Sequence, residues 1–332
     1  MKGTHINSVL ILSYKEIRQL VTMPECITLM RTAFRELSAG RVQIPQRIGM
    51  DHSPFHGASL FMPGYYPDKK QFGIKVVTLF RDNNKLGLPL INGLMLIFDA
   101  TNGLPLALMD AEYLTALRTG AASGLATDLL ARPDAHTVAI FGAGTQGAFQ
   151  LEAVNEVRKI EKTYVYDPDA DKAHAFCEKM TQKLDLNIEY ARNSSGVINA
   201  DIICTATPSA HPLFEAKDVK PGTHINAIGS YQPDKTEIPP GLVAHSKIVV
   251  DHRPAALAEA GEIVQTIKAG RITPDSIFAE LGELLIRSEN ARTNDREITL
   301  FKSVGNAIQD LETAHFIIGR ALEKKTGTFV TI

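Results

Sequence analysis

One glycine-rich segment constrains the fold of this chain more than any other feature of its sequence. An apolar run over residues 138–141 leads directly into Gly142-Ala143-Gly144-Thr145-Gln146-Gly147, and a helix-like pattern follows. A GxGxxG pattern predicts a dinucleotide site only in this strand–turn–helix context. The first glycine permits the tight turn, the second admits a pyrophosphate, and the third lets the helix pack against the strand. The helix N-terminus then offers free N–H groups and partial positive charge to the phosphates.

A carboxylate follows at the expected distance. Asp167 ends the next apolar strand and lies 20 residues after Gly147. An acid at this place accepts hydrogen bonds from the ribose hydroxyls of NAD and repels the 2′-phosphate of NADP. No arginine stands immediately after Asp167 to offset its charge, so we expect NAD(H) as the cofactor. A purely structural glycine turn is the alternative, but the strand, turn, helix and acid together favour the dinucleotide site.

Two later strand-like runs end in small polar residues. Thr205 and Thr207 end the apolar run that begins at Ile202, and Ser230 follows a similar run at residues 224–228. Ligands of doubly wound sheets bind at the carboxyl ends of the strands, so these three residues are expected to line the cofactor cleft. The alternative is that the threonines cap a local turn.

The order of the predicted elements changes along the chain. Capping-box spacing of Thr22 and Glu25, with Gly40 as a stop signal, predicts a helix over about 23–39. Strand-like segments at 59–62, 72–80, 94–99 and 104–110 are separated by Gly, Pro and Asn, which indicates an antiparallel sheet. A helix-like stretch at 112–131 leads out of this region.

Strands and helices then alternate. The expected strands are 137–141, 163–166, 188–191, 201–205, 224–228 and 247–250, with helices at 145–158 and 169–184. Such alternation predicts a parallel α/β sheet, and a last helix at about 304–323 is expected to return to the first domain. The fold class is therefore α/β, with a Rossmann dinucleotide-binding domain and a separate α+β domain.

The charge balance excludes some partners. Thirty-five basic against 37 acidic residues give a net charge of −2, so no field attracts nucleic acid or an anionic membrane. No apolar run is long enough to cross a bilayer, and the N-terminus shows no signal-peptide pattern.

Cysteine and histidine spacings predict neither a disulfide nor a metal site. Cys26, Cys177 and Cys204 form no CxxC pair, and Pro54 opposes the helix that would align His52 with His56 as metal ligands. Cysteine usage of this kind fits a reducing compartment, and we expect a cytoplasmic protein.

A lysine interrupts the apolar strand over 72–80. Lys75 shares a face with Val77 and Leu79. Burial would lower its pKa and suit it to proton transfer or to carboxylate binding. Spacing alone favours the alternative, an edge-strand lysine with its ammonium in water.

Two arginines are further candidates. Arg118 stands among small residues in LRTGAAS, and its guanidinium suits bidentate binding of a substrate carboxylate. A helix-surface arginine explains Arg118 equally well. Arg47, in a short strand-like segment, is the weaker candidate, because such a residue is more often simply solvated.

Four segments make the chain similar to a known family. They are GIKVV around Lys75, GLPLINGLMLIFDATNGLPLALMDAEYLTALRTGAASGLATDLLA around Arg118, the turn FGAGTQG, and FKSVGNAIQDLETA near the end. Together they resemble the ornithine cyclodeaminase/mu-crystallin family from about Pro24 to Ala321. The RTGAASG and FKSVG–AIQD elements are specific to that family, whereas the glycine turn is not.

The resemblance implies a homodimer of two-domain chains. Residues 1–118 with 305–332 would bind substrate and form the dimer, and residues 119–304 would be the Rossmann domain that binds NAD(P). Lys75 then resembles the active-site lysine and Arg118 the ligand of the substrate carboxylate, with Arg47 as a second basic contact. The positions similar to the family's dinucleotide contacts are Thr119, Gln146, Asp167, Thr207 and Ser303.

One departure from the family pattern bears on the reaction. Ornithine cyclodeaminases carry an aspartate in a stretch resembling GGDCPGKTEL, whereas Tyr231 takes its place here and Asp234 comes three residues later. A tyrosine is neutral at pH 7 and does not replace a carboxylate paired with an ammonium. The preferred function is therefore an NAD(H)-dependent imino-acid (ketimine) reductase, or amino-acid dehydrogenase, with hydride transfer at Cα. Tyr231 would donate a hydrogen bond near the substrate nitrogen.

Two alternatives stay open. An ornithine cyclodeaminase would convert ornithine to proline and ammonia with recycled NAD, and a mu-crystallin-type protein would bind a dinucleotide with little catalysis. Net consumption of the cofactor distinguishes the reductase from the cyclodeaminase. Retention of Lys75 and Arg118 argues against the binding protein.

Overall fold

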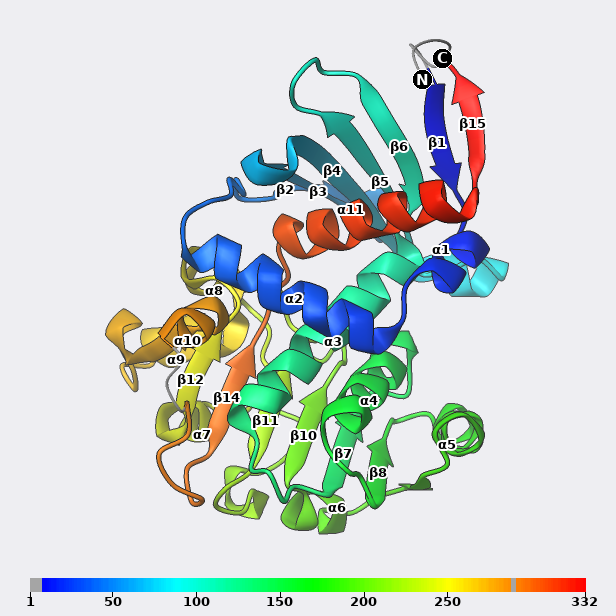
Figure 1. Cartoon of the computed structure of the whole chain (residues 1–332). Coiled ribbons are helices and arrows are strands. Elements are labelled where there is room, and N and C mark those ends of the chain that lie inside the picture. The colour runs from blue at the N-terminus through cyan, green and yellow to red at the C-terminus, as the bar shows by residue number, and fades with distance from the viewer. Residues whose placement is uncertain (1–7, 288–290) are drawn as a thin grey trace. The chain divides into compact units, whose positions relative to one another are not determined.

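The computed structural model describes residues 8–287 and 291–332. The chain divides into two compact units, Met1–Arg118 with Asn306–Ile332, and Thr119–Gly305. The division falls within one helix, α3 (Glu112–Leu130). Each unit contains one β-sheet (Figure 1).

The first unit contains a seven-stranded sheet in the order β15-β1-β6-β5-β4-β3-β2. The strands are β1 (Ser8–Leu12), β2 (Ile48–His52), β3 (Gly57–Tyr66), β4 (Gln71–Phe80), β5 (Ile91–Asp99), β6 (Pro105–Asp110) and β15 (Thr328–Thr331). Strands β3 to β6 pair antiparallel, which confirms the arrangement predicted for these segments, and β2 adds a further antiparallel strand beside β3. Strands β1 and β15 were not predicted: β15 is the edge strand, and β1 lies between it and β6, with which it pairs parallel.

Helix α11 (Ala307–Lys324) covers one face of this sheet, and α2 (Met23–Ser38) packs on α11. Two sheet glycines permit the close approach, because a Cβ at Gly64 or Gly73 would lie 2.8 or 3.1 Å from Leu311. The Thr22–Glu25 capping box before α2 is confirmed. Helix α1 (Tyr14–Leu20) lies beside α11. The predicted start of α11 at 304 was early, because Gly305 has a φ of +77° and Asn306 is the N-cap.

The second unit contains an eight-stranded sheet in the order β13-β12-β14-β11-β10-β7-β8-β9, and every neighbouring pair is parallel. The strands are β7 (Thr137–Phe141), β8 (Lys162–Tyr166), β9 (Asn187–Tyr190), β10 (Ile202–Thr205), β11 (His224–Ala227), β12 (Lys247–Val250), β13 (Ile277–Glu280) and β14 (Thr299–Lys302). The predicted doubly wound parallel sheet is confirmed, although β13 and β14 were missed. The strand order reverses between β7 and β10, which is where such sheets bind ligands.

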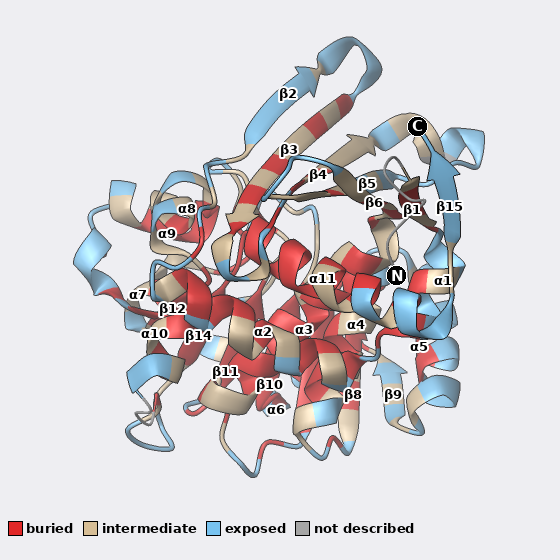
Figure 2. Ribbon diagram, turned by 45° about the horizontal axis from the view of Figure 1, so that its top comes forward, coloured by how far each residue is buried: buried red, intermediate tan, exposed pale blue. Residues whose placement is uncertain are grey.

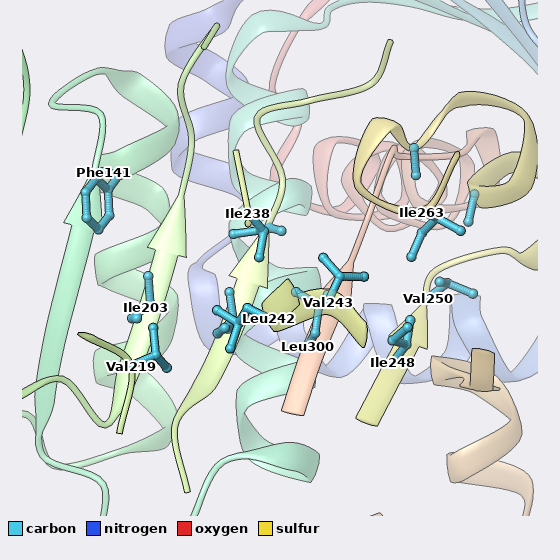
Figure 3. Close-up of a cluster of buried hydrophobic side chains, with 14 of the residues drawn as sticks. Phe141, Ile203, Val219, Ile238, Leu242, Val243, Ile248, Val250, Ile263 and Leu300 are labelled. Atoms are coloured by element: carbon cyan, nitrogen blue, oxygen red, sulfur yellow. The ribbon is translucent and has the colours of Figure 1, made fainter. Parts of the chain in front are cut away.

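Alternate residues of this second sheet enter two cores, one on each face. Ile140 and Ile202 pack with α4 (Thr145–Val157) and α5 (Ala170–Leu184). Phe141 and Ile203 face the other core, with Leu242 and its neighbours (Figure 3). The helices that supply this second core include α6 (Ser195–Asn199), α7 (Pro240–His245), α8 (Arg253–Glu259) and α9 (Gly261–Lys268), and α10 (Leu281–Arg287) follows β13. Near-continuous apolar strands are the pattern of a sheet buried on both faces.

Within the two described stretches of chain, none of the helices combines the length and the apolar character that a bilayer crossing requires.

Candidate active site

Lys75 is a buried residue of a central strand. Strand β4 pairs with β3 on one side and β5 on the other, and Lys75 faces Met62 and Met95 across the two ladders. Its side chain is only 1% exposed, and Nζ donates a hydrogen bond to Oδ1 of Asp310 at 2.9 Å. The edge-strand interpretation, which spacing alone favoured, is wrong. A buried ammonium is tolerated here because α11 supplies a carboxylate.

Arg118 contributes a second buried cation to the same carboxylate. Its Nε donates to Oδ1 of Asp310 at 3.0 Å, and its Nη1 donates to Oε1 of Gln309. Arg118 is 5% exposed, so the helix-surface alternative is wrong as well. One oxygen of Asp310 thus binds two cations, while Oδ2 has no hydrogen-bond partner in the described part of the chain. We call Lys75, Arg118 and Asp310 the cation cluster.

The cation cluster carries a net positive charge. Burial lowers the pKa of Lys75 to about 7, the charge of Arg118 acts in the same direction, and Asp310 opposes both. Arg47, half-buried just before β2, also lowers the pKa of Lys75 through its charge. With Lys75 protonated, the two cations of the cluster exceed its one carboxylate, so a bound anion would be stabilised here.

Asp310 and Gln309 were missed by sequence reasoning. They lie in the first turn of α11, on a stretch of the helix that is otherwise buried and largely apolar. A signal was available, because the sequence contained cations in apolar surroundings that required a carboxylate. Nothing in the local pattern says which of the 37 acidic residues supplies it.

The glycine turn has the geometry that the pattern predicts. Gly142 has a φ of +102°, and Gly144 is the N-cap of α4. A Cβ at Gly147 would lie 2.0 Å from the carbonyl oxygen of Gly142, so only glycine fits there. No described atom beyond the chain neighbours lies within 4 Å of a Cβ built at Gly144, which leaves its surroundings open. Ala143 is buried within the turn.

The first residues of α4 differ in exposure. Thr145 is exposed, while Gln146 is half-buried. The Oε1 atom of Gln146 is buried without a hydrogen-bond partner among the residues that the structure describes.

Asp167 stabilises the turn from the end of β8. Its Oδ2 accepts hydrogen bonds from the backbone N–H of Ala143 at 2.8 Å and from Nζ of Lys172 at 3.0 Å. Burial acts to raise the pKa of Asp167, but these bonds, that from the Asp169 N–H and the charge of Lys172 hold it below its ordinary value. Sequence reasoning found no arginine after Asp167 and overlooked Lys172, which offsets part of the negative charge.

The other predicted cofactor residues, four at strand ends and Thr119 within α3, take part in hydrogen bonds within the unit. Thr205 and Thr207 both donate to Glu237, a residue that sequence reasoning missed. Ser230 Oγ donates to the carbonyl oxygen of Lys235 at 2.8 Å. The remaining two are Thr119, whose carbonyl accepts from Gln150 at 3.4 Å, and Ser303, whose hydroxyl donates to Asp251 at 2.8 Å.

The predicted site residues thus fall into two groups. The first unit brings Lys75 and Arg118 together and places the charge of Arg47 near them. The second unit contains the turn, Asp167 and the polar strand ends. Tyr231 also belongs to the second unit, where it is half-buried against the apolar core of Figure 3. Its catalytic role stays a prediction.

The two histidines considered as metal ligands have other partners. His52 Nε2 lies 2.8 Å from Ser59 Oγ, and His56 Nδ1 lies 2.6 Å from Asp82 Oδ2. Over residues 8–287 and 291–332 there is no group of three or more His, Cys, Asp or Glu arranged to hold a metal ion.

Comparison with known proteins supplies the context for this geometry. A Delta(1)-pyrroline-2-carboxylate reductase of Bacillus cereus is 38% identical over 321 residues, which covers 96% of this chain and 98% of that protein. The solved Delta(1)-pyrroline-2-carboxylate reductase of Thermococcus litoralis, in complex with NADH and L-proline, is 40% identical with a TM-score of 0.94 and covers 97% of this chain and 100% of its own.

An archaeal alanine dehydrogenase dimer with bound NAD is similar as well. It is 34% identical with a TM-score of 0.91, and the match covers 98% of this chain and 99% of that one. The ornithine cyclodeaminase/mu-crystallin family matches residues 7–325. The chain therefore belongs to the ornithine cyclodeaminase/mu-crystallin family.

Proposed function

We propose that this protein is an NAD(H)-dependent reductase of small imino acids, which also runs in reverse as an amino-acid dehydrogenase. The observation that carries the proposal is the cation cluster, which combines a buried lysine of lowered pKa with a buried arginine on one carboxylate. Such a cluster suits a substrate with an α-carboxylate next to a carbon–nitrogen bond. The similar reductase solved with NADH and L-proline supports the same assignment.

In this mechanism Arg118 and Arg47 bind the substrate carboxylate, which fixes the imine carbon. NADH, when bound, supplies the hydride that this carbon accepts. Lys75 gives a proton to the imine nitrogen, so that the C=N bond becomes CH–NH, and it is protonated again from water. Tyr231 donates a hydrogen bond near the same nitrogen. Positioning of the carbon supplies most of the rate enhancement.

We assign the dinucleotide to the second unit. The adenine-side ribose hydroxyls would bind Asp167, and the pyrophosphate would lie over Gly144 at the start of α4. The open surroundings of Gly144 and the partnerless Oε1 of Gln146 fit this assignment. In this assignment residues 1–118 and 305–332 bind the substrate and residues 119–304 bind the cofactor, as the sequence predicted. We expect the protein to act in the cytoplasm.

Net consumption of NADH tests the proposal directly. Purified protein should oxidise NADH stoichiometrically with pyrroline-2-carboxylate, and the same panel should include pyruvate with ammonia. Lys75→Met should lower kcat/KM by at least about 100-fold, because the proton donor is lost. Lys324→Met, on the exposed end of α11, is the control and should stay within about twofold of the parent.

Other outcomes of that assay would refute the proposal. Proline formed from ornithine with only catalytic NAD+ would identify a cyclodeaminase. Ligand binding without turnover of any substrate would identify a binding protein.

The pKa of Lys75 predicts the pH profile. Reduction requires the ammonium form, so kcat/KM should be level below about pH 7 and fall roughly tenfold per pH unit above it. Oxidation of the amino acid requires the neutral amine of Lys75, so kcat/KM in that direction should rise over the same pH range. Asp310→Asn removes the charge that raises this pKa and should move the break to lower pH. A break that stays in place in Asp310→Asn would assign the titration to the substrate and contradict the role of Lys75.

Cofactor preference provides a third prediction. Asp167→Ser removes the ribose ligand and leaves Lys172 available to a 2′-phosphate, so the preference for NADH over NADPH should fall by about tenfold or more. The ratio of the two Kd values is the measurement, because the loss of the bond to Ala143 weakens both cofactors. Lys172→Ala should shift the ratio the opposite way. An unchanged ratio in Asp167→Ser would refute the ribose assignment.

We also propose that two chains associate through the open face of the first sheet. Cross-strand pairing places Ile48, Phe61, Val76 and Leu94 in one row on the face opposite Lys75. Ile48 is 61% and Leu94 is 51% exposed, and β2 is almost wholly exposed in Figure 2. A contiguous apolar face of this kind marks an interaction site, and the similar alanine dehydrogenase is a dimer.

Sedimentation should find twice the mass of one chain. A double variant, Ile48→Lys with Leu94→Lys, should shift the protein to the monomer because two charges would be buried in the interface. Leu322→Lys, at an exposed position of α11, is the matched control and should remain dimeric. A double variant that keeps the parent mass would exclude this face.

A further inference from the structure

A buried glutamate joins the ends of two strands at the carboxyl edge of the second sheet. Glu237 is 0% exposed and follows β11 in the chain. Its Oε1 accepts hydrogen bonds from the N–H and the hydroxyl of Thr207, at 2.8 and 2.7 Å. Its Oε2 accepts from the hydroxyl of Thr205 and from the N–H of Gly229, both at 2.9 Å. One carboxylate therefore fixes residues that follow β10 and residues that follow β11.

Two more buried charges extend this connection to a third strand. The N–H of Glu237 donates to Oε1 of Glu262 at 2.9 Å, and Oε2 of Glu262 lies 2.9 Å from Nζ of Lys302. Lys302 ends β14, and its Nζ donates to the carbonyl oxygen of Ser230 at 2.5 Å. Glu262 and Lys302 are at most 1% exposed. We call Glu237, Glu262 and Lys302 the carboxyl-edge network.

Buried charged groups such as those of the carboxyl-edge network are an inefficient way to stabilise a fold. Burial raises the pKa of Glu237, while the charge of Lys302 and the hydrogen bonds from Thr207 oppose the rise. Two carboxylates share one lysine, and buried ion pairs are often no more stabilising than apolar residues of the same volume. The Glu237 carboxylate instead holds the two strand ends at a fixed separation, because both of its oxygens accept hydrogen bonds from them.

We propose that Glu237, held by Glu262 and Lys302, is a positioning residue for the dinucleotide, which sets Thr207 and the Gly229–Ser230 backbone in their binding positions before the cofactor arrives. The inference rests on the proposed binding of NAD(H) to the second unit. Glu237 itself is fully buried and its oxygens already accept four hydrogen bonds, so it acts through its partners rather than on the cofactor.

Gly229 supports this geometry independently of charge. A Cβ at Gly229 would lie 2.4 Å from the carbonyl oxygen of Thr207 and 2.5 Å from Oε1 of Glu237. The close approach therefore requires glycine at this position. Gly229→Ala should separate the two strand ends without adding or removing a charge.

Glutamine cannot reproduce the hydrogen bonds of Glu237. Each carboxylate oxygen accepts a backbone N–H, from Thr207 on one side and Gly229 on the other. Whichever way a glutamine amide is turned, its NH2 group faces one of these N–H donors. One strand end must then move away, so Glu237→Gln disrupts the geometry at nearly constant volume.

The opposite end of the sheet provides a matched control. Asp201 is also buried, and its Oδ2 accepts the N–H groups of His136 and Thr137 at 3.0 Å. Its Oδ1 accepts from Arg132 at 2.9 Å. Asn at this position keeps one oxygen for the two backbone donors. Asp201→Asn therefore perturbs a buried carboxylate of the same unit at the amino ends of β7 and β10.

The experiment measures the Kd for NADH by fluorescence, with no substrate present, and the melting temperature of each full-length variant. Glu237→Gln and Gly229→Ala should raise the Kd by about tenfold or more, a difference of about 1.4 kcal/mol. Asp201→Asn should lower the melting temperature yet leave the Kd within about twofold. In turnover, Glu237→Gln should raise the KM for NADH more than it lowers kcat.

Two less disruptive variants at Thr205 keep the test decisive if Glu237→Gln fails to fold. Thr205 is 0% exposed, so its hydroxyl reaches Glu237 rather than the surface. Thr205→Val should raise the Kd by about threefold or more, and Thr205→Ser, which retains the hydroxyl, should restore it.

Parent-like NADH affinity in Glu237→Gln, or in Thr205→Val if the former does not fold, would overturn the positioning role while leaving the proposed function intact. Equal weakening by Asp201→Asn would overturn it too, because the effect would then be one of stability. A parent protein that binds no NADH would overturn both.

Discussion

A single oxygen atom, Oδ1 of Asp310, constrains the first unit of this protein. It accepts hydrogen bonds from Lys75 on β4 and from Arg118 on α3, two cations that the fold removes almost entirely from water. Each of the three residues makes burial of the others tolerable, because an unpaired charge in this place would cost several kcal/mol. The return of the chain to this unit after residue 305 brings the required carboxylate into it, since Asp310 lies on α11.

The second unit uses carboxylates in a different way. Asp167 and Glu237 each accept backbone N–H groups from loops at the carboxyl edge of the sheet, and Asp251 does the same for the Val304 and Gly305 N–H groups. Loops at this edge need irregular backbone whose donors find no ladder partner, and a buried acid satisfies several of them at once. Buried carboxylates therefore fix the irregular backbone of this edge.

The sequence was sufficient to predict those elements that are determined by residues close together in the chain. The turn at Gly142, the strands around it and the α2 capping box depend on neighbouring residues and were found to within a few positions. Local spacing failed where the deciding partner is remote. For Lys75 it favoured an edge strand, because the acid that binds this lysine lies 235 positions away, and the charge of Asp167 was considered without that of Lys172. Glu237 carried no signal, because its donors are backbone groups and two hydroxyls whose convergence depends on strand order.

The alternation of β4 has a consequence for how this chain can change over evolutionary time. Lys75 points to the helix-covered face, and its neighbour Val76 belongs to the apolar row on the other face. A single inserted or deleted residue within the strand would exchange the two faces, placing an ammonium among apolar side chains and an isopropyl group beside Asp310. Strand β4 is therefore not expected to tolerate insertions or deletions. New substrate preferences must arise by substitution along a strand of fixed register, or by remodelling of the turns at its ends.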